Sequence, residues 1–270
     1  MIFMRKPVIT LLTDFGNKDP YVAEMKAVIL TICPEATIVD ISHEVEKFNI
    51  RMGAFFLASS ANFFPKGTVH VGVVDPGVGT KRRAIVVETD KDLFVGPDNG
   101  LLMLAAERQG LKNIYSIQNT DYMLPKISYT FHGRDIFSPV AAHLALGVPA
   151  SAVGPKIEDY VLPDFAKPSV DGEVIVGEVL HVDGFGNVIT NFSEDFLRGF
   201  GLNEGDLIDV SVNERSFRLR LCKAYGEVEK GELLAIFDSY GFLEFSVNLG
   251  NASNFLGAKI GDKVKIKLNF

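Results

Sequence analysis

Strand-like apolar runs alternate with helical segments over residues 1–150, and this alternation constrains the fold more than any other feature. Residues 8–13 form an apolar run, residues 21–33 have helical periodicity, and residues 37–42 form the next run. Strands this apolar, separated by helices, are typical of a mostly parallel sheet covered on both faces. We therefore expect an α/β sandwich in the N-terminal part of the chain.

The alternation continues to residue 147, where a glycine ends the last apolar helix. Because ligands of such sheets collect outside the carboxyl ends of the strands, polar residues that follow a strand become candidates for a site. The further strands are expected at 68–75, 82–89, 93–96 and 113–117, and the further helices at 50–64, 101–110 and 131–147.

The pattern changes after residue 147. Residues 148–172 contain four prolines and little periodicity, which is typical of a crossover between domains. Short strands with tight turns follow, and these indicate a small barrel or sandwich. We expect an N-terminal α/β domain over 1–160 and a smaller β-barrel-like domain over 161–270. Its strands are expected at 172–183, 186–192, 206–212, 215–225, 232–239, 242–249 and 263–270.

Composition and motif searches narrow the class of protein. The net charge is -7 and the basic residues are scattered, so no nucleic-acid-binding face is expected. The N-terminal apolar run is too short for a signal peptide, and no run approaches the length of a membrane span. Walker, G-x-G-x-x-G, G-x-S-x-G, H-E-x-x-H and C-x-x-C motifs do not occur. A soluble cytoplasmic globular protein is the expectation.

Three polar segments stand at ends of the predicted strands, at residues 13–16, 75–83 and 129–135. Each also has a purely structural explanation: a turn-forming aspartate, an ion pair across a turn, and the cap of a helix, respectively. Because strand ends of one sheet converge in space, three such segments together indicate a site.

A fourth polar segment, at residues 181–191, lies in the β-rich part. It places Asp183, Phe185 and Asn187 within five residues, and Asp183-Gly184-Phe185-Gly186 can also be a plain hairpin turn. An anion, an aromatic face and an amide suit a ligand that carries an ammonium group and a heteroaromatic ring.

These segments, in this order, resemble the S-adenosyl-L-methionine hydroxide adenosyltransferases, which are related to the bacterial fluorinase and chlorinase. The matching motifs are TDFG, ICPEATIVDISHEV, VDPGVGTKRR, TFHGRDIFSPVAAHLA and HVDGFGNVITNF, and they cover essentially the whole chain. The resemblance implies a homotrimer whose active sites lie between the N-terminal domain of one subunit and the C-terminal domain of the next. It implies that S-adenosylmethionine and water give adenosine and methionine without a cofactor. Because the thioether leaves as a neutral group, no metal is expected to be needed.

The resemblance also implies roles for residues of the N-terminal part. The catalytic residues are Asp75, Arg82 and His132, and Asp14 binds the ribose while Phe48 lies over the ligand. Which of Asp75 and His132 takes the proton from water stays open. The remaining substrate contacts of this part are Thr130, Phe131 and Gly133.

In the C-terminal part the resemblance implies that Asp183 holds the methionine end of the substrate, and that Phe185 and Asn187 contact the nucleoside. A looser match adds Tyr225 stacked on adenine, and polar contacts by Ser239 and the backbone of Val247.

The halogenases of this group carry tyrosines at the positions of Asp75 and His132, and the fluorinase carries a serine at that of Gly133. The present residues therefore favour hydrolysis over halogenation. Three alternatives remain open: a halide-using S-adenosylmethionine lyase, a non-catalytic sensor of adenosine or S-adenosylmethionine, and a metal-dependent hydrolase with Asp14, Asp75 and His132 as ligands.

Overall fold

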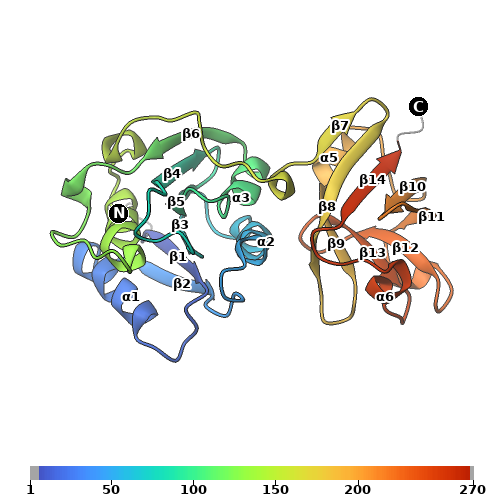
Figure 1. Ribbon diagram of the computed structural model, residues 1–270, viewed down its shortest axis with the longest axis horizontal. Coiled ribbons are helices and arrows are strands. Elements are labelled where there is room, and N and C mark those ends of the chain that lie inside the picture. The colour runs from blue at the N-terminus through green and yellow to red at the C-terminus, as the bar shows by residue number, and fades with distance from the viewer. Residues whose placement is uncertain (1–5, 268–270) are drawn as a thin grey trace, which may run out of the picture. The chain divides into compact units, whose positions relative to one another are not determined.

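The structure is a computed structural model that describes residues 6–267. The chain divides into two compact units, Met1–Leu162 and Pro163–Phe270, and each has a hydrophobic core of its own. The first unit carries helices around a sheet, whereas the second, coloured yellow to red, consists mainly of strands (Figure 1). Among the described residues, no helix has the length and apolar character needed to cross a membrane.

The first unit is built on a six-stranded sheet with the order β2-β1-β3-β5-β4-β6. Strand β4 runs antiparallel to its neighbours β5 and β6, and the other pairings are parallel. The expected mostly parallel sheet is confirmed. Its strands are β1 (Val8–Thr13), β2 (Thr37–Ser42), β3 (Val69–Val73), β4 (Ala84–Thr89), β5 (Leu93–Pro97) and β6 (Leu111–Ser116).

Helices cover both faces of this sheet. Helix α1 packs against α4 on one face, and α2 packs against α3 on the other (Figure 1). Alternation along β1 explains the two layers, because Ile9 and Leu11 join the α1–α4 core while Leu12 approaches Gly53 of α2. The helices are α1 (Tyr21–Ile32), α2 (Ile50–Ala61), α3 (Met103–Arg108) and α4 (Ser138–Ala145), with short turns η1 (Thr120–Tyr122) and η3 (Ala150–Val153).

The predicted helix 131–147 is two elements rather than one. A π-helical turn, η2 (Gly133–Phe137), precedes α4. Pro139 at the start of α4 lacks an N–H group, and the Ser138 hydroxyl donates a 2.7 Å hydrogen bond to the Gly133 carbonyl oxygen instead. His132 is therefore the residue that caps this widened turn.

One edge of the sheet collects the polar segments. Asp14 follows the end of β1, and Asp75 follows the end of β3 by two residues. Since β4 is antiparallel, it starts at the edge where β5 ends, with Ala84 paired to Pro97. Arg82, just before β4, therefore emerges at the same edge as the two aspartates.

The second unit is a closed barrel of seven strands. The order is β14-β10-β11-β12-β13-β9-β8, and β14 pairs with β8 to close the ring, while β7 adds to β8 outside it. This agrees with the expected β-barrel-like fold, although residues 268–270 of the last predicted strand lie outside the described part. The strands are β7 (Ser169–Asp171), β8 (Val174–Val182), β9 (Val188–Ser193), β10 (Leu207–Val212), β11 (Arg215–Cys222), β12 (Leu233–Phe237), β13 (Phe242–Val247) and β14 (Lys263–Lys267).

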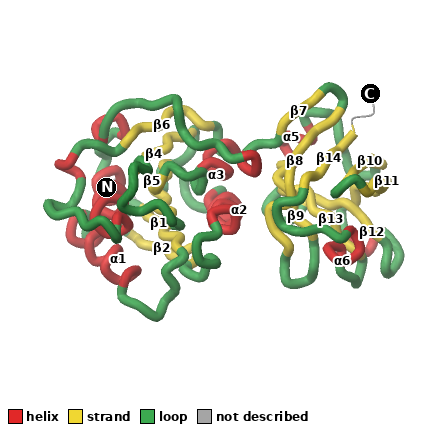
Figure 2. The backbone as a smooth tube through the Cα atoms, viewed as in Figure 1, coloured by secondary structure: helices red, strands yellow, loops and turns green. Residues whose placement is uncertain are grey.

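Short helical segments decorate the barrel, and Figure 2 shows them in red beside the yellow strands. Side chains cap two of these helices. The Ser193 hydroxyl accepts a hydrogen bond from the Phe196 N–H at the start of α5, and the Asn251 side chain accepts one from the Asn254 N–H at the start of α6. These segments are α5 (Glu194–Arg198), α6 (Ala252–Leu256), η4 (Asp164–Ala166) and η5 (Tyr225–Glu227).

Candidate active site

The structure brings Asp75, Arg82 and His132 into direct contact. The Arg82 guanidinium donates from Nε to Asp75 Oδ1 at 3.1 Å and from Nη2 to Asp75 Oδ2. The same Nη2 lies 3.0 Å from Nδ1 of His132. The side chains of Arg82 and Asp75 are only 8% and 5% exposed, so this bidentate pair is largely buried.

A close approach between two loops creates this contact. Gly79 has a φ of +75°, and a Cβ atom there would lie 2.2 Å from the Tyr129 carbonyl oxygen. Only glycine adopts such a conformation readily and also leaves room for the other backbone. The loop 75–83 can therefore reach the loop 128–133 and place Arg82 beside His132.

The imidazole of His132 is held in its neutral form. Burial lowers the pKa of His132, and the positive charge of Arg82 lowers it further, against opposing effects of Asp75, Asp135 and the Ser128 carbonyl. A guanidinium has no lone pair, so Arg82 is the donor in its contact with Nδ1 of His132. Nδ1 therefore acts as an acceptor and carries no proton.

Asp135 orders the loop that carries His132. Its carboxylate is fully buried and accepts hydrogen bonds from the Ser128 N–H at 2.8 Å and the Ser128 hydroxyl at 2.6 Å. Arg134 Nε donates to the other carboxylate oxygen at 2.7 Å. Burial opposes ionisation, but the hydrogen bonds from Arg134 and Ser128 outweigh it and lower the pKa of Asp135. Sequence reasoning missed this role, although Asp135 stands in the quoted motif.

Asp14 is presented by a turn that is bonded along its length to the loop after β2. His43 accepts from the Gly16 N–H at 2.7 Å through its carbonyl oxygen, and its ring Nδ1 lies 2.9 Å from the Thr13 hydroxyl. The Phe48 N–H donates to Asp14 Oδ2 at 2.9 Å, and the Lys47 ammonium donates to the Asp14 carbonyl oxygen. The buried Asp14 carboxylate is therefore fixed in direction through its Oδ2.

A cavity of about 350 Å³ opens between these loops. Arg82 does not line it and contacts Asp75 and His132 instead. The sequence-predicted residues on its wall are Asp14, Phe48, Asp75, Thr130, Phe131, His132 and Gly133. The sequence did not single out the others: Phe15, Tyr21, Lys47, Val73 and Val78.

Aromatic side chains form one wall of this cavity. The rings of Phe15, Tyr21 and Phe131 pack with centroids 5.2–5.7 Å apart. Phe48 stands at the rim with a φ of +65°, and 68% of it is exposed. A bulky residue in the left-handed region is strained, and the hydrogen bond from its N–H to Asp14 holds it there. The proximity of Phe15 to Asp14 in the TDFG motif is the signal that could have identified this wall.

The second unit has a pocket of about 430 Å³ that collects most of the residues predicted there. Asp183 Oδ1 accepts hydrogen bonds from the N–H groups of Phe185 and Asn187 at 2.9 Å. The segment therefore forms the hairpin turn that the sequence allowed and also lines a pocket. The lining residues are Asp183, Phe185, Asn187, Tyr225, Val247, Asn248, Leu249 and Gly250, and none of them is basic. Phe185 and Leu249 stand at the rim of this pocket, and their exposed fractions are 81% and 80%.

Ser239 is not among the residues that line this pocket. It lies in the turn between β12 and β13, where Asp238 Oδ1 accepts from the N–H groups of Tyr240 and Phe242 at 2.8 Å. Its predicted contact with the substrate stays a prediction.

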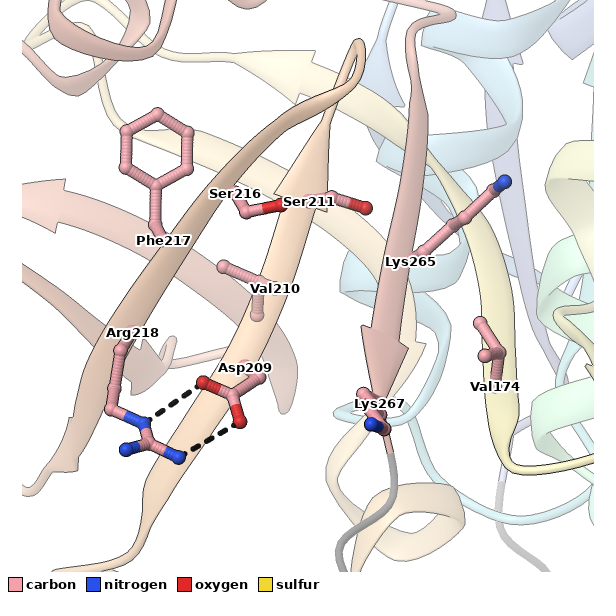
Figure 3. Close-up of a pocket in the computed structure, with 9 residues that line it drawn as sticks. All are labelled: Val174, Asp209, Val210, Ser211, Ser216, Phe217, Arg218, Lys265 and Lys267. Carbon is pink, nitrogen blue, oxygen red and sulfur yellow. Dashed lines mark hydrogen bonds and ion pairs between the residues drawn. The ribbon is translucent and has the colours of Figure 1, made fainter.

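A further cavity of about 470 Å³ lies on the barrel over β8, β10, β11 and β14 (Figure 3). Arg218 and Asp209 satisfy each other there through bonds of 2.9 and 3.0 Å. The sequence-predicted residues do not line it, and we assign it no function. Its lining residues are Val174, Asp209, Val210, Ser211, Ser216, Phe217, Arg218, Lys265 and Lys267. Within residues 6–267, no group of three or more His, Cys, Asp or Glu side chains could hold a metal ion.

Fold and site define a class: a two-unit protein whose α/β unit holds an Asp–Arg–His cluster on the wall of a small-molecule-sized cavity, followed by a closed barrel with a pocket of its own. Residues 9–154 match the model of the SAM hydroxide adenosyltransferase N-terminal domain, and residues 177–265 match that of the C-terminal domain. The chain belongs to the SAM hydroxide adenosyltransferase family.

Relatives match over nearly the whole chain. An (R)-S-adenosyl-L-methionine hydrolase of Salinispora tropica is 39% identical over 96% of this chain and 97% of the relative. One of Methanocaldococcus jannaschii is 37% identical over 98% of both. A fluorinase of Actinopolyspora mzabensis is 27% identical over 97% of both. A solved structure of an uncharacterized conserved protein from Thermotoga maritima superposes with a TM-score of 0.80 at 46% identity, over 96% of this chain and 99% of the other.

Proposed function

We propose that this protein hydrolyses S-adenosyl-L-methionine to adenosine and L-methionine by attack of water on the C5′ carbon. The contact of Arg82 with Asp75 and His132, two residues of the cavity wall, is the observation that carries the proposal. The full-length similarity to proteins named (R)-S-adenosyl-L-methionine hydrolase supports the choice of substrate.

The reaction requires little of the protein beyond the positioning of the attacking water and the substrate. The C5′–S bond breaks with its electron pair going to sulfur, so methionine leaves as a neutral thioether while a water oxygen bonds to C5′ and one proton is released. What is needed is a water held in line with the C–S bond, about 3 Å from the carbon. An ordered array of charged groups supplies that position and stabilises the developing hydroxide.

Within this array, Asp75 accepts the hydrogen bond from the attacking water. The Nδ1 lone pair of His132 already accepts from Arg82, whereas the Asp75 carboxylate keeps lone pairs beyond the two that face Arg82. Arg82 orients the carboxylate and stabilises the negative charge that develops on the water oxygen. His132, kept neutral, positions Arg82.

The other cavity residues bind the nucleoside. The fixed carboxylate of Asp14 accepts hydrogen bonds from the ribose hydroxyls, and Phe48 covers the ligand. Thr130, Phe131 and Gly133 form the wall behind the reacting carbon. In the barrel pocket, Asp183 pairs with the substrate ammonium. The nucleoside contacts there are Phe185, Asn187, Tyr225, Ser239 and the backbone of Val247.

The substrate is bound between subunits of a homotrimer, and no cofactor takes part. Each unit presents a pocket with exposed apolar side chains at its rim, Phe48 in one and Phe185 and Leu249 in the other, and this exposure supports burial against another subunit. The site then takes Asp75 from one chain and Asp183 from its neighbour.

The reaction is tested with S-adenosylmethionine in ¹⁸O-water. We expect label in the 5′-hydroxyl of adenosine and none in methionine, and an Asp75→Asn variant that releases adenosine at least tenfold more slowly. A parallel incubation with chloride asks for 5′-chloro-5′-deoxyadenosine. Chlorinated product in place of adenosine, or intact substrate after hours on a protein that binds it, contradicts hydrolysis. Loss of activity with a chelator contradicts the metal-free mechanism.

The shared site is tested by mixing two impaired variants, Asp75→Asn and Asp183→Ala, under conditions that allow subunits to exchange. In a ring of head-to-tail interfaces, about one site in four then combines an intact Asp75 with an intact Asp183. We expect about a quarter of wild-type activity to return. If both residues come from one chain, the mixture stays as inactive as its parts, and light scattering reports the trimer independently.

A further inference from the structure

Glu244 is a buried carboxylate without an ionic partner. It lies on β13 and is 4% exposed. Several other buried carboxylates face a cation, as Asp135 does with Arg134 and Glu178 with Lys263. Within residues 6–267, Glu244 forms no ion pair, and it accepts hydrogen bonds instead. Burial of a carboxylate costs free energy that its hydrogen bonds must offset, so Glu244 is tied to the two hydroxyl groups that donate to it.

Glu244 points away from the core of the barrel. Its neighbours Leu243 and Phe245 belong to that core, and since side chains alternate along a strand, Glu244 and Ser246 lie on the outer face of β13. Both are nevertheless buried. The segment 223–230, which contains η5, packs here through Val228 against the small apolar cluster of Cys222, Leu234 and Ile236. We call this segment the strap.

Two side-chain contacts fasten the strap, and both involve residues of the barrel pocket. The Tyr225 hydroxyl donates to Glu244 Oε1 at 2.9 Å, and Asn248 Nδ2 donates to the Val228 carbonyl oxygen at 2.8 Å. The Ser246 hydroxyl donates to the same Glu244 oxygen at 2.5 Å and so fixes the carboxylate. Tyr225 is 44% exposed and lines the pocket, so the bond to Glu244 determines where its ring stands.

The electrostatics keep this arrangement intact. Burial raises the pKa of Tyr225 to about 12, and the nearby Glu244 contributes, so the phenol keeps its proton and remains a donor. Burial also raises the pKa of Glu244, although the hydrogen bonds from Ser246 and Tyr225 oppose that shift. Either protonation state of Glu244 leaves an oxygen that accepts from Tyr225.

We propose that Glu244 is a positioning residue for the substrate: by anchoring the Tyr225 hydroxyl, it fixes the aromatic wall of the barrel pocket. The inference rests on the proposed function, in which Tyr225 contacts the adenosyl group. Glu244 touches neither substrate nor the reacting atoms. Its effect is therefore on how tightly the ligand is held, and the reaction at the Asp75 cluster proceeds at a similar rate once the ligand is bound.

The test compares Glu244→Ala, Glu244→Gln and Tyr225→Phe in the intact protein. Loss of a hydrogen bond to a charged group corresponds to about tenfold in affinity, so we expect Glu244→Ala to raise KM for S-adenosylmethionine about tenfold and to change kcat by less than about twofold. The Kd for adenosine, measured by calorimetry, rises to the same extent. Tyr225→Phe behaves likewise, and the double variant is no worse, because either single change already breaks the bond. Glu244→Gln keeps an acceptor oxygen and stays within about twofold of wild type.

Thr190→Val is the matched control, since it removes another buried hydrogen bond of the same barrel, from the Thr190 hydroxyl to the Leu243 carbonyl oxygen at 2.7 Å. It lowers the melting temperature without changing KM. The inference is overturned if Glu244→Ala and Tyr225→Phe keep the wild-type KM. It is also overturned if Glu244→Ala and Thr190→Val change KM equally. If Glu244→Ala does not fold, Tyr225→Phe and Glu244→Gln decide. A wild-type protein that neither binds adenosine nor consumes S-adenosylmethionine refutes the proposed function instead.

Discussion

Removal of the Arg82 side chain is the sharpest test of the catalytic cluster. The guanidinium donates two hydrogen bonds to Asp75 and one to His132, and it lies 5.4 Å above the ring of Phe137. In Arg82→Ala the Asp75 carboxylate, 5% exposed, loses its counter-ion. Removing one partner of a buried ion pair typically costs about 3–5 kcal/mol. We expect about 3 kcal/mol here, because the cavity admits water to one side of Asp75.

The effect on catalysis is larger than the effect on stability. Without Arg82, no cation orients Asp75 or stabilises the developing hydroxide. Loss of one preorganised electrostatic group typically lowers kcat by about 10²–10³-fold, and we expect a fall in that range for adenosine release. Because Arg82 does not line the cavity, KM should change much less than kcat.

Arg83 offers a matched control at the next position. It pairs with Asp98, whose side chain is 4% exposed, and with Asp159, and it contacts no member of the cluster. Arg83→Ala should therefore lose stability as well but keep kcat within about threefold of wild type. Urea unfolding gives the stabilities, and chromatography of adenosine gives the rates at a temperature where both variants are folded. Equal losses of kcat in the two variants, or full turnover in Arg82→Ala, would falsify the role given to Arg82.

Three other outcomes can be measured. The pKa of His132 in the folded protein is lowered from its ordinary value of 6.5, so the unfolded chain takes the proton first and stability should fall as the pH drops below 6.5, with no effect of this group above pH 7. Turnover should fall only at the lower pH at which the folded protein protonates His132; urea unfolding measures the first effect, and a pH–rate profile of wild type against His132→Asn measures the second. Gly79→Ala should lower kcat at least about tenfold, because its Cβ would lie 2.2 Å from the Tyr129 carbonyl oxygen. Gly77→Ala is the control and should keep its kcat, because the nearest atom to its Cβ lies 3.5 Å away. Asp14→Ala should raise KM about tenfold or more, because the ribose hydroxyls lose their acceptor, and an unchanged KM in initial-rate assays counts against that assignment.

Much of the α/β unit could be predicted because its signals are local and long. The runs 8–13 and 37–42 are strands with those bounds. The first is a buried parallel strand and is apolar along most of its length, whereas the second is an edge strand that alternates apolar with polar residues. The gathering of Asp14 and Asp75 follows from topology alone, because both succeed parallel strands. The position of Arg82 beside Asp75 was harder to predict from the residues alone. It depends on β4 being antiparallel, and the apolar pattern of residues 84–89 does not reveal the direction of the strand.

The elements that escaped prediction are short or depend on distant partners. Helices α5 and α6 have five residues each, too few for a period of 3.6 to show, and their capping residues are also common in turns. The strap looks like an ordinary connection in sequence and owes its position to Glu244, 19 residues after Tyr225. The bonds between the loops after β1 and β2 join groups far apart in the chain, such as the Thr13 hydroxyl with the His43 ring and the Phe48 N–H with Asp14, and no local pattern reveals such a pairing.

The spacing of the proposed catalytic cluster along the chain has a consequence for the order of its assembly. Asp75 and Arg82 are 7 residues apart, whereas Arg82 and His132 are 50 apart. In the unfolded chain, the entropy of loop closure makes the second contact about 1.7 kcal/mol more costly to form than the first. During folding we therefore expect the carboxylate and the guanidinium to pair before the imidazole joins them, because His132 arrives only with the strands that fold between residues 82 and 132.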